Sequence, residues 1–412
     1  MTHEDREAPE ADRSRGDRQQ GGLNARGDRP DRPAGRFSSN PLLYRLKRSL
    51  EIFERPDGDV YLLRLGAGDD LVIRSPSARD RALLRALDDG FASLDKLCDR
   101  LGRSAGELSA AIAELTDAGL VEVRDAKRPL SAPTAERFDR QLVYLAELAE
   151  PGESADALQA TLADARIAII GCGGLGSWVA CGLSEIGVGS LVLIDDDRVE
   201  LSNLNRQILF SEQQLGELKV DAAADSLRAH NSSVAIETVV TRIEGPDDLR
   251  AVLDSDVALV VCTGDWPPHD LGRWVNSVCA ELGIAWIGAG QFPPRLRVGP
   301  LVVPGVSACL ECLEADARRT HPLYDEIATY RDRRPRPDPS VGPVSAVIGS
   351  LIASEAMHLL VGSGSPASLG HTLLLDLRSM RMDRVEVRPD PECGTCAAAR
   401  AVSTASKSAA FI

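Results

Sequence analysis

Aromatic side chains are scarce in this 412-residue chain, where Phe, Trp and Tyr together make up 4%. Hydrophobic residues still reach 43%, so the core has to be built mostly from Leu, Val, Ile and Ala. No stretch contains the roughly 18 uncharged apolar residues that a membrane-spanning helix needs. The N-terminus also has no apolar segment of the signal-peptide type. These absences predict a cytoplasmic protein without a membrane partner.

Positive charge is also in short supply. The chain has 47 Lys and Arg residues against 62 Asp and Glu residues, which gives a formal net charge of −15. An acidic chain is repelled by the phosphates of nucleic acids and by anionic membranes. We therefore expect no nucleic-acid partner.

The first 40 residues have almost no apolar side chains and are rich in Arg, Asp, Gly, Pro and Glu. Such a segment cannot bury enough surface to offset the entropy lost on ordering. We predict a disordered tail over residues 1–40. The length of the remaining chain is enough for two or three domains.

Residues 41–124 form the first region with regular apolar patterning. "LEIFERPDGDVYLLRLGAGDDLVIRS" predicts three short strands, with turns at "RPDGD" and "GAGDD". Helical spacing follows over 78–90, 93–102 and 104–120, with Ser93 and Ser104 as N-caps and Glu107 completing a capping box. With the closing strand in "GLVEVRD", this pattern predicts a small winged-helix-like α+β domain.

A winged helix often binds DNA, but the third helix exposes Glu107, Glu114 and Asp117 where a recognition helix needs Lys or Arg. From Leu42 to Val123 the region instead resembles PqqD-like leader-peptide recognition domains. "LLRALDDGFASLDKLCDRLG" and "IAELTDAGLVEV" carry this resemblance. It implies that a partner peptide adds as a strand beside the three-stranded sheet and rests on the third helix. A purely structural winged helix is the alternative.

Composition sets the remaining boundaries. Residues 125–136, "DAKRPLSAPTAE", are polar and contain proline, which is typical of a linker. The main domain is predicted over 137–396. Residues 397–412, ending in "SKSAAFI", are predicted to be a tail.

A nucleotide-binding pattern opens the main domain. The apolar strand 165–170 leads into Gly171, Gly173 and Gly176, the G-x-G-x-x-G spacing in which backbone N–H groups approach phosphates, and Gly174 lies in the same turn. A second strand, "SLVLI", ends at Asp195, where a carboxylate can accept from a ribose hydroxyl. This much would also suit an NAD-dependent oxidoreductase, which is one alternative.

The residues that follow favour a nucleoside triphosphate. "DDDRVELSNLNRQ" places Arg206 shortly after the ribose-binding Asp195, and Lys219 begins a helical pattern. An NAD site needs no such cations, whereas a triphosphate carries more charge.

Together, "GCGGLG", "IDDDRVELSNLNRQ", Lys219 and "RFDRQ" (137–141) resemble the ThiF/MoeB/HesA family, the bacterial relatives of ubiquitin-activating enzymes. The resemblance covers about residues 137–396. It implies a Rossmann-like α/β sheet, a homodimer, and adenylation of a carboxylate with ATP and Mg²⁺. It also implies that Arg140 reaches into the active site of the partner subunit.

The resemblance assigns roles to individual side chains. The catalytic candidates are Arg140, Arg206, Lys219 and Asp265. The nucleotide-binding candidates are Gly171, Gly173, Gly174, Gly176, Asp195, Asp197, Asn203 and Gln207.

The magnesium position departs from the family pattern. The family has a Thr-Asp-Asn segment, whereas this chain has Thr263, then Gly264, then Asp265, with no Asn. Asp265 follows a strand-like run, where ligand sites of open α/β sheets lie, and is the Mg²⁺ candidate; Asp270 is the second choice. The departure keeps a non-catalytic alternative open.

The cysteines provide a candidate zinc site. An odd count of 9 in a large chain argues against a disulfide framework. Two C-x-x-C pairs supply four thiolates, enough for a closed tetrahedral Zn²⁺ site, and ThiF-like enzymes carry such a site. The four residues are Cys309, Cys312, Cys393 and Cys396. A redox pair or free thiols are the alternatives.

The other cysteines, Cys98, Cys172, Cys181, Cys262 and Cys279, are expected to be small buried hydrophobes. Family members that transfer sulfur often carry a Cys before the "GP" helix, and "THPLYDEIATYRDRRPRPDPSVGPVSAVIGS" has none. We therefore expect no covalent sulfur step. The run Arg331 to Arg336 is either a flap over the substrate or a solvated loop.

These observations predict ATP-dependent adenylation of a carboxylate on a precursor peptide or small carrier protein, in the biosynthesis of a ribosomally made, modified peptide. Two alternatives are a non-catalytic leader-binding partner of a YcaO-type cyclodehydratase and a sulfur-carrier adenylyltransferase of the thiamine or molybdopterin type.

Overall fold

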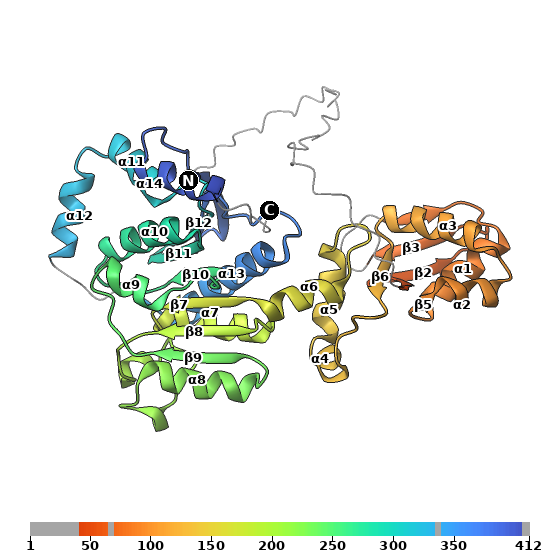
Figure 1. Ribbon diagram of the computed structural model, residues 1–412, viewed down its shortest axis with the longest axis horizontal. Helices are drawn as coiled ribbons and strands as arrows, with labels where there is room; N and C mark the ends of the chain where they lie inside the picture. Colours follow the sequence, from red (N-terminus) through yellow and green to blue (C-terminus); the bar gives the residue numbers. More distant parts are fainter. Residues whose placement is uncertain (1–40, 65–69, 334–338, 406–412) are drawn as a thin grey trace, which may run out of the picture. The chain divides into compact units, whose positions relative to one another are not determined.

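The computed structural model describes residues 41–64, 70–333 and 339–405 (Figure 1). The predicted disordered tail, most of the "GAGDD" turn, part of the Arg331–Arg336 run and the final "SKSAAFI" residues lie outside the described ranges. In the described ranges the protein is an α/β structure with a small N-terminal domain and a large-sheet domain, as the sequence predicts.

Two small antiparallel sheets and three helices form the N-terminal domain. The first sheet, in the order β5-β1-β6, comprises β1 (Leu42–Leu46), β5 (Ala92–Ser93) and β6 (Val121–Asp125). The second comprises β2 (Leu50–Glu54), β3 (Val60–Arg64) and β4 (Leu71–Ile73). The helices are α1 (Ala78–Asp88), α2 (Leu94–Leu101) and α3 (Ala105–Asp117).

The local signals in this domain are confirmed. Ser93 caps α2, and Ser104 and Glu107 form the predicted capping box of α3. Buried leucines on the strands and helices make one core. Strand β1 was not predicted, because its partner β6 lies about 80 residues away and a five-residue strand has little pattern of its own.

The predicted linker contains more regular structure than its composition indicated. Strand β6 extends to Asp125, and Ser131 caps helix α4 (Ala132–Arg137), with Pro133 in the first turn where its missing N–H is harmless. Helices α5 (Asp139–Leu148) and α6 (Ala155–Asp164) then lead into the sheet. The predicted tail is also helical at its start, since α14 runs over Gly394–Ala405.

The large domain is built on an eight-stranded sheet in the order β14-β13-β12-β11-β10-β7-β8-β9. Its parallel strands are β7 (Arg166–Ile170), β8 (Ser190–Ile194), β9 (Ala235–Val239), β10 (Leu259–Cys262) and β11 (Ala285–Phe292). Antiparallel strands β12 (Arg295–Val302), β13 (His371–Asp376) and β14 (Arg381–Glu386) extend one edge. β10 crosses back beside β7, so the sheet has the switch point at which open α/β sheets bind ligands.

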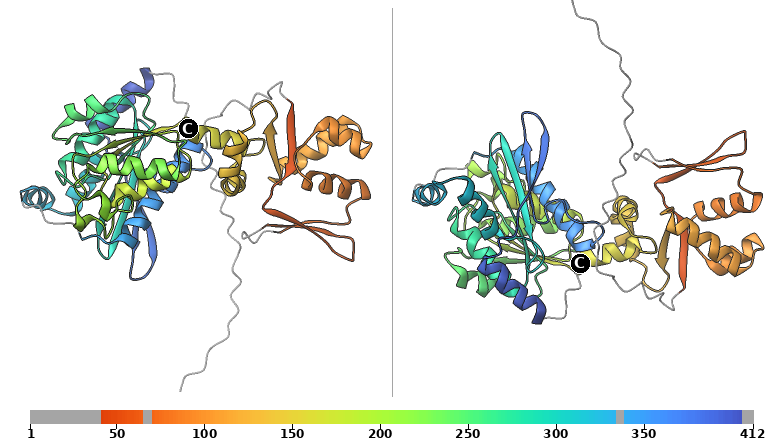
Figure 2. Two further views of the ribbon diagram at one scale, coloured as in Figure 1. Left: turned by 90° about the horizontal axis from the view of Figure 1, so that it is seen from below. Right: turned by 90° about the horizontal axis from the view of Figure 1, so that it is seen from above.

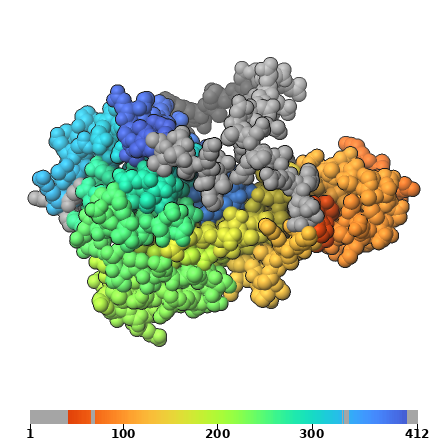
Figure 3. Space-filling model, in the orientation of Figure 1, coloured from red at the N-terminus to blue at the C-terminus, as the bar shows by residue number. Residues whose placement is uncertain are grey.

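Helices cover both faces of this sheet (Figure 2). One face packs against α7 (Gly174–Glu185), α8 (Lys219–His230) and α13 (Gly342–Val361). The other packs against α9 (Pro246–Val252), α10 (Asp270–Leu282) and α11 (Leu310–Thr320). Helix α12 (Tyr324–Asp332) follows α11 and exposes Leu323, Ile327 and Tyr330 at the surface (light blue in Figure 3).

Helix α13 is long and apolar enough to cross a membrane by length and composition, with a mean hydropathy of 1.7. The count of uncharged residues missed it because Glu355 interrupts the run. The helix packs against α7, and ten of its residues are buried, which is what the core helix of a globular domain shows.

Candidate functional site

The glycine turn between β7 and α7 lies at the carboxyl edge of the sheet. Gly171 has a φ of +90°, and a Cβ there would lie 2.7 Å from the backbone N of Gly264. A Cβ on Gly176 would lie 1.8 Å from the carbonyl O of Gly171. These contacts are the physical reason for the glycine spacing: the turn closes against α7 on one side and against the end of β10 on the other.

Thr263 joins the end of β10 to this turn. Its hydroxyl Oγ1 donates to the carbonyl O of Gly171 at 2.7 Å and lies 3.0 Å from the carbonyl O of Ile170. The segment that carries Asp265 is therefore anchored beside the glycine turn. The sequence analysis did not assign a role to Thr263.

Asp195 is held in place by two backbone donors. Its Oδ2 accepts from the N–H of Cys172 at 2.6 Å, and its Oδ1 accepts from the N–H of Asp197 at 2.8 Å. Burial raises the pKa of Asp195 above its ordinary value, while nearby Lys219 opposes the rise. The predicted ribose-binding carboxylate thus lies directly against the glycine turn.

Lys219 is the first residue of α8, and its side chain is buried. The ammonium Nζ lies 2.7 Å from Oδ2 of Asp197, and the backbone N–H of Lys219 donates to the carbonyl O of Asp197 at 2.9 Å. The loop after β8 and the start of α8 are therefore joined, which places the predicted cation beside Asp195.

Arg206 lies over the start of α7. A Cβ on Gly174 would lie 3.4 Å from Cδ of Arg206, and the guanidinium Nη1 donates to the carbonyl O of Ser202 at 2.8 Å. Gln207 is buried near Gly173, and its Oε1 has no hydrogen-bond partner among the described residues. An unpaired buried amide oxygen indicates that a donor is absent from its surroundings.

Asn203 has a local structural role in the same loop. It is buried, and its Oδ1 accepts from the N–H of Glu200 at 3.0 Å, closing a short 3₁₀ turn. This turn fixes the backbone from which Arg206 and Gln207 project.

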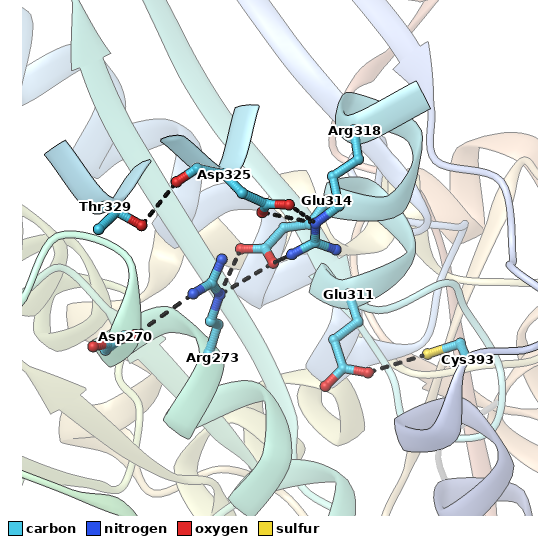
Figure 4. A network of polar contacts seen from close by, with 8 residues as sticks. All are labelled: Asp270, Arg273, Glu311, Glu314, Arg318, Asp325, Thr329 and Cys393. Atoms are coloured by element: carbon cyan, nitrogen blue, oxygen red, sulfur yellow. Dashed lines mark hydrogen bonds and ion pairs between the residues drawn. The ribbon is translucent and has the colours of Figure 1, made fainter. Parts of the chain in front are cut away.

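Asp265 is exposed and follows the anchored Gly264 at the carboxyl edge. Asp270, the second choice, begins α10 and lies 3.6 Å from Nη1 of Arg273, which also contacts Glu314 (Figure 4). Asp270 thus belongs to an ion-pair network, and Asp265 remains the better Mg²⁺ candidate.

Arg140 is not brought to the glycine turn of its own chain by any contact of the described residues. Its side chain is 97% exposed on α5, and its ion pair is with neighbouring Asp139 at 3.9 Å. The adjacent Gln141 is anchored instead, donating to Oε1 of Gln159 at 2.6 Å and to the carbonyl O of Ile186 at 2.8 Å.

Two residues at the turn were not predicted. Ser345, in the first turn of α13, is fully buried, and its Oγ would lie 3.3 Å from a Cβ on Gly174. Nε2 of Gln291 donates to this Oγ at 3.1 Å, while Oε1 of Gln291 has no partner in the described ranges. The "VGPVSAVIG" helix start was recognised in the sequence, but no signal singled out Ser345 within it.

The four cysteines of the predicted zinc site meet in space although about 80 residues separate the two pairs. All four are buried, and their sulfur atoms lie within 4.8 Å of one another. The Sγ–Sγ distance is 3.5 Å for Cys309–Cys393 and 3.6 Å for Cys312–Cys396. The backbone N–H of Asp390 also donates to Sγ of Cys312 at 3.3 Å. Four clustered sulfur ligands fit a tetrahedral Zn²⁺ site.

Residues 138–395 match the ThiF family. The chain belongs to the ThiF family. The match spans the glycine turn, Asp195, Arg206, Lys219, Asp265 and the four cysteines. The Rossmann-like α/β fold predicted from the sequence is confirmed.

Relatives of this ThiF chain include adenylyltransferases. The "Sulfur carrier protein ThiS adenylyltransferase" of Escherichia coli strain K12 is 33% identical over 267 residues, which cover 64% of this chain and 96% of the relative. The "SAMP-activating enzyme E1" of Haloferax volcanii is 30% identical over 267 residues, covering 65% and 90%. The ThiF chain described here is an ATP-dependent adenylyltransferase.

Solved structures with the same fold include E. coli MccB with AMPCPP and MccA, at a TM-score of 0.66 and 23% identity. The similarity covers 86% of this chain and 99% of that one. Residues 71–125 match the DprA winged helix domain, which agrees with the predicted winged helix but does not confirm the PqqD-like resemblance.

Proposed function

We propose that this ThiF-family enzyme adenylates a carboxylate of a peptide in the biosynthesis of a ribosomally made, modified peptide. The observation that carries this proposal is the extent of the similarity to MccB. It covers 86% of the chain, whereas the sulfur-carrier relatives match 63–65% of it. A chain that adds a winged-helix domain to the adenylating domain has a second surface for holding a peptide substrate.

The chemistry is an attack by a carboxylate oxygen on the α-phosphorus of ATP. A new P–O bond forms, the bond between the α-phosphorus and the bridging oxygen breaks, and pyrophosphate leaves with that oxygen. AMP is then a good leaving group for a later nucleophile. The protein contributes mainly positioning and charge neutralisation.

The residues at the carboxyl edge suit these tasks. The glycine turn offers backbone N–H groups to the phosphates, and fixed Asp195 accepts from the ribose. Lys219 and Arg206 offset negative charge that develops on the phosphates. When Mg²⁺ is bound, Asp265 would hold it, and the ion would supply further charge neutralisation.

The homodimer and the zinc site belong to the same proposal. Arg140 is almost fully exposed on α5, as a side chain that acts in the partner subunit has to be. The four-cysteine cluster would hold a structural Zn²⁺ that joins the start of α11 to the start of α14.

Sulfur-carrier adenylation is the second candidate, because the relatives of 30–33% identity include enzymes with that name. The segment between Thr320 and Gly362 contains no Cys that could receive sulfur. A carrier protein that is adenylated without a later sulfur step on this enzyme would still fit.

The test begins with Mg-ATP binding measured by calorimetry on the wild type, Arg206→Ala and the exposed control Arg228→Ala, beside NADH. We expect ATP binding that only Arg206→Ala weakens, and no NADH binding. ATP–pyrophosphate exchange with peptides that have free or amidated C-termini then identifies the carboxylate. A folded protein that binds no ATP would overturn the enzyme and favour a leader-binding scaffold.

A further inference from the structure

Arg297 on β12 is a part-buried cation with no negatively charged partner among the described residues. Its Nη1 donates to the carbonyl O of Gly299 at 3.1 Å. No carboxylate in the described ranges forms an ion pair with it, in contrast to Arg273, which lies 3.1 Å from Glu314 (Figure 4). A guanidinium that is removed from water without a counter-charge is costly to keep.

The ionisable groups that face Arg297 do not supply that charge. They are Cys262 at the end of β10 and Tyr324 at the start of α12. Burial raises the pKa of Cys262 to about 12 and the pKa of Tyr324 above its ordinary 10.0, so both are neutral at pH 7. Burial also lowers the pKa of Arg297.

The sheet register places Arg297 near the reacting end of the nucleotide site. Arg297 pairs with Gly290 on β11, and Gly288, two residues earlier on the same face, pairs with Cys262 on β10. The next residue after Cys262 is Thr263, which is hydrogen-bonded to the glycine turn. The guanidinium therefore lies at the same edge of the sheet as the turn, across β10 and β11 from it.

The two glycines leave no side chain of their own between Arg297 and Cys262. A Cβ on Gly290 would lie 2.6 Å from the ring of Phe292, so this ring occupies the space beside Arg297. The Phe292 side chain is 58% exposed. An exposed ring next to an unpaired cation is suited to a group with an apolar part and an anionic end.

We propose that Arg297 binds a carboxylate of the acceptor substrate, with Phe292 packing against the residue that carries it. This rests on the proposed function. A guanidinium matches a carboxylate with two parallel hydrogen bonds. The phosphates of ATP are a poorer match, because the glycine turn, Arg206 and Lys219 already face them on the other side of β10.

The test measures carboxylate preference directly. A pool of N-acetylated hexapeptides without Asp or Glu is prepared with free C-termini and again with amidated C-termini. Equilibrium dialysis with mass spectrometry measures binding of both pools to the full chain, with and without a non-hydrolysable ATP analogue. We expect the wild type to bind the free-acid pool about tenfold more tightly, a difference of about 1.4 kcal/mol.

The Arg297→Gln variant should lose this preference and keep its ATP affinity. The matched control is Arg295→Gln on the same strand, whose side chain is 70% exposed and lies 4.0 Å from Asp376, and it should keep the preference. Thermal unfolding checks that each variant is folded. If Arg297→Gln does not fold, Arg297→Lys takes its place, with a several-fold loss expected because Lys keeps the charge but not the fork.

Two results would overturn the inference: equal binding of both pools by the wild type, or a preference that survives in the folded Arg297 variant. Failure of the proposed function has a different signature. A wild type that binds no ATP but still prefers the free-acid pool in the dialysis without nucleotide would keep the carboxylate site and reject the adenylating enzyme.

Discussion

The ammonium nitrogen of Lys219 lies 2.7 Å from Oδ2 of Asp197, two residues beyond the carboxylate predicted to bind ribose. The Lys219 side chain is 8% exposed, whereas that of Asp197 is 63% exposed. The acid can therefore turn into solvent when phosphates arrive, and the buried lysine cannot leave the site. This asymmetry makes the ion pair a resting arrangement that an anionic ligand can replace.

We expect Lys219→Met to lower the rate of ATP–pyrophosphate exchange on the order of 100-fold, because a cation beside developing phosphate charge is lost. The unfolding temperature should change little, since Asp197 is well solvated without its partner. Exchange kinetics and calorimetry measure the effect. Lys127→Met, at an exposed position, is the control. Equal exchange rates for Lys219→Met and the wild type would remove Lys219 from the proposed machinery.

Gly176 and Gly106 provide a matched pair of glycines within helices. A Cβ on Gly176 would lie 1.8 Å from the carbonyl O of Gly171, whereas a Cβ on Gly106 in α3 would meet nothing within 4 Å. Gly176→Ala should cost about 3 kcal/mol or more and abolish ATP binding, because α7 must move away from the turn. Gly106→Ala should be neutral or slightly stabilising. Denaturant unfolding and ATP calorimetry compare the two, and normal ATP affinity in Gly176→Ala would contradict the tight turn.

Much of the nucleotide site could be predicted from the sequence because its signals are local. The glycine spacing, the strand that ends before Asp195 and the helix that begins at Lys219 each depend on a few neighbouring residues. Ser345 and Gln291 could not be predicted in this way, since they reach the turn from elements more than 100 residues away. Only the order of the strands brings them there.

The same distinction explains the differences in the fold. The caps of α2 and α3 were predicted because each lies within four residues of its helix. β1 was missed because what fixes it is pairing with a strand about 80 residues away. Helix α4 was hidden by Pro133 and by polar residues, which are typical of linkers but also allowed in a first helical turn.

The cysteine cluster predicts a distinctive pattern of thiol reactivity. Cys172, Cys181, Cys262 and Cys279 are buried, and burial raises the pKa of Cys181 to about 11. In the native protein we expect Cys98, which is partly exposed, to react first with a thiol reagent at pH 7.5. A chelator should release about one Zn²⁺ per chain and expose the four cluster thiols.

Substitution separates the metal from simple packing. Cys312→Ser should remove the bound Zn²⁺ and lower the unfolding temperature. Cys279→Ser, at an equally buried position outside the cluster, should lower the unfolding temperature and leave the zinc content unchanged. Metal analysis of purified protein measures the difference. Wild-type protein purified without zinc, yet as stable as protein loaded with zinc, would argue against a structural metal.

Arg140 allows a test of the dimer that needs no structure of the complex. If Arg140 acts in the partner's site, neither Arg140→Ala nor Lys219→Met is active alone. A mixed dimer of the two variants, however, has one site with an intact Lys219 and an Arg140 supplied by the other chain. Random pairing at equal amounts makes half of the dimers mixed, so about 25% of wild-type exchange activity should return.

The size of this recovery decides where Arg140 acts. Co-expression with two different affinity tags allows the mixed dimer to be purified, and its activity should then rise to about half of the wild-type value, because one of its two sites is intact. An arginine that served its own chain would leave both sites of the mixed dimer defective, with no recovery at any ratio. The exposed position of Arg140, whose described ion pair is with neighbouring Asp139, is the arrangement that recovery in the mixed dimer requires.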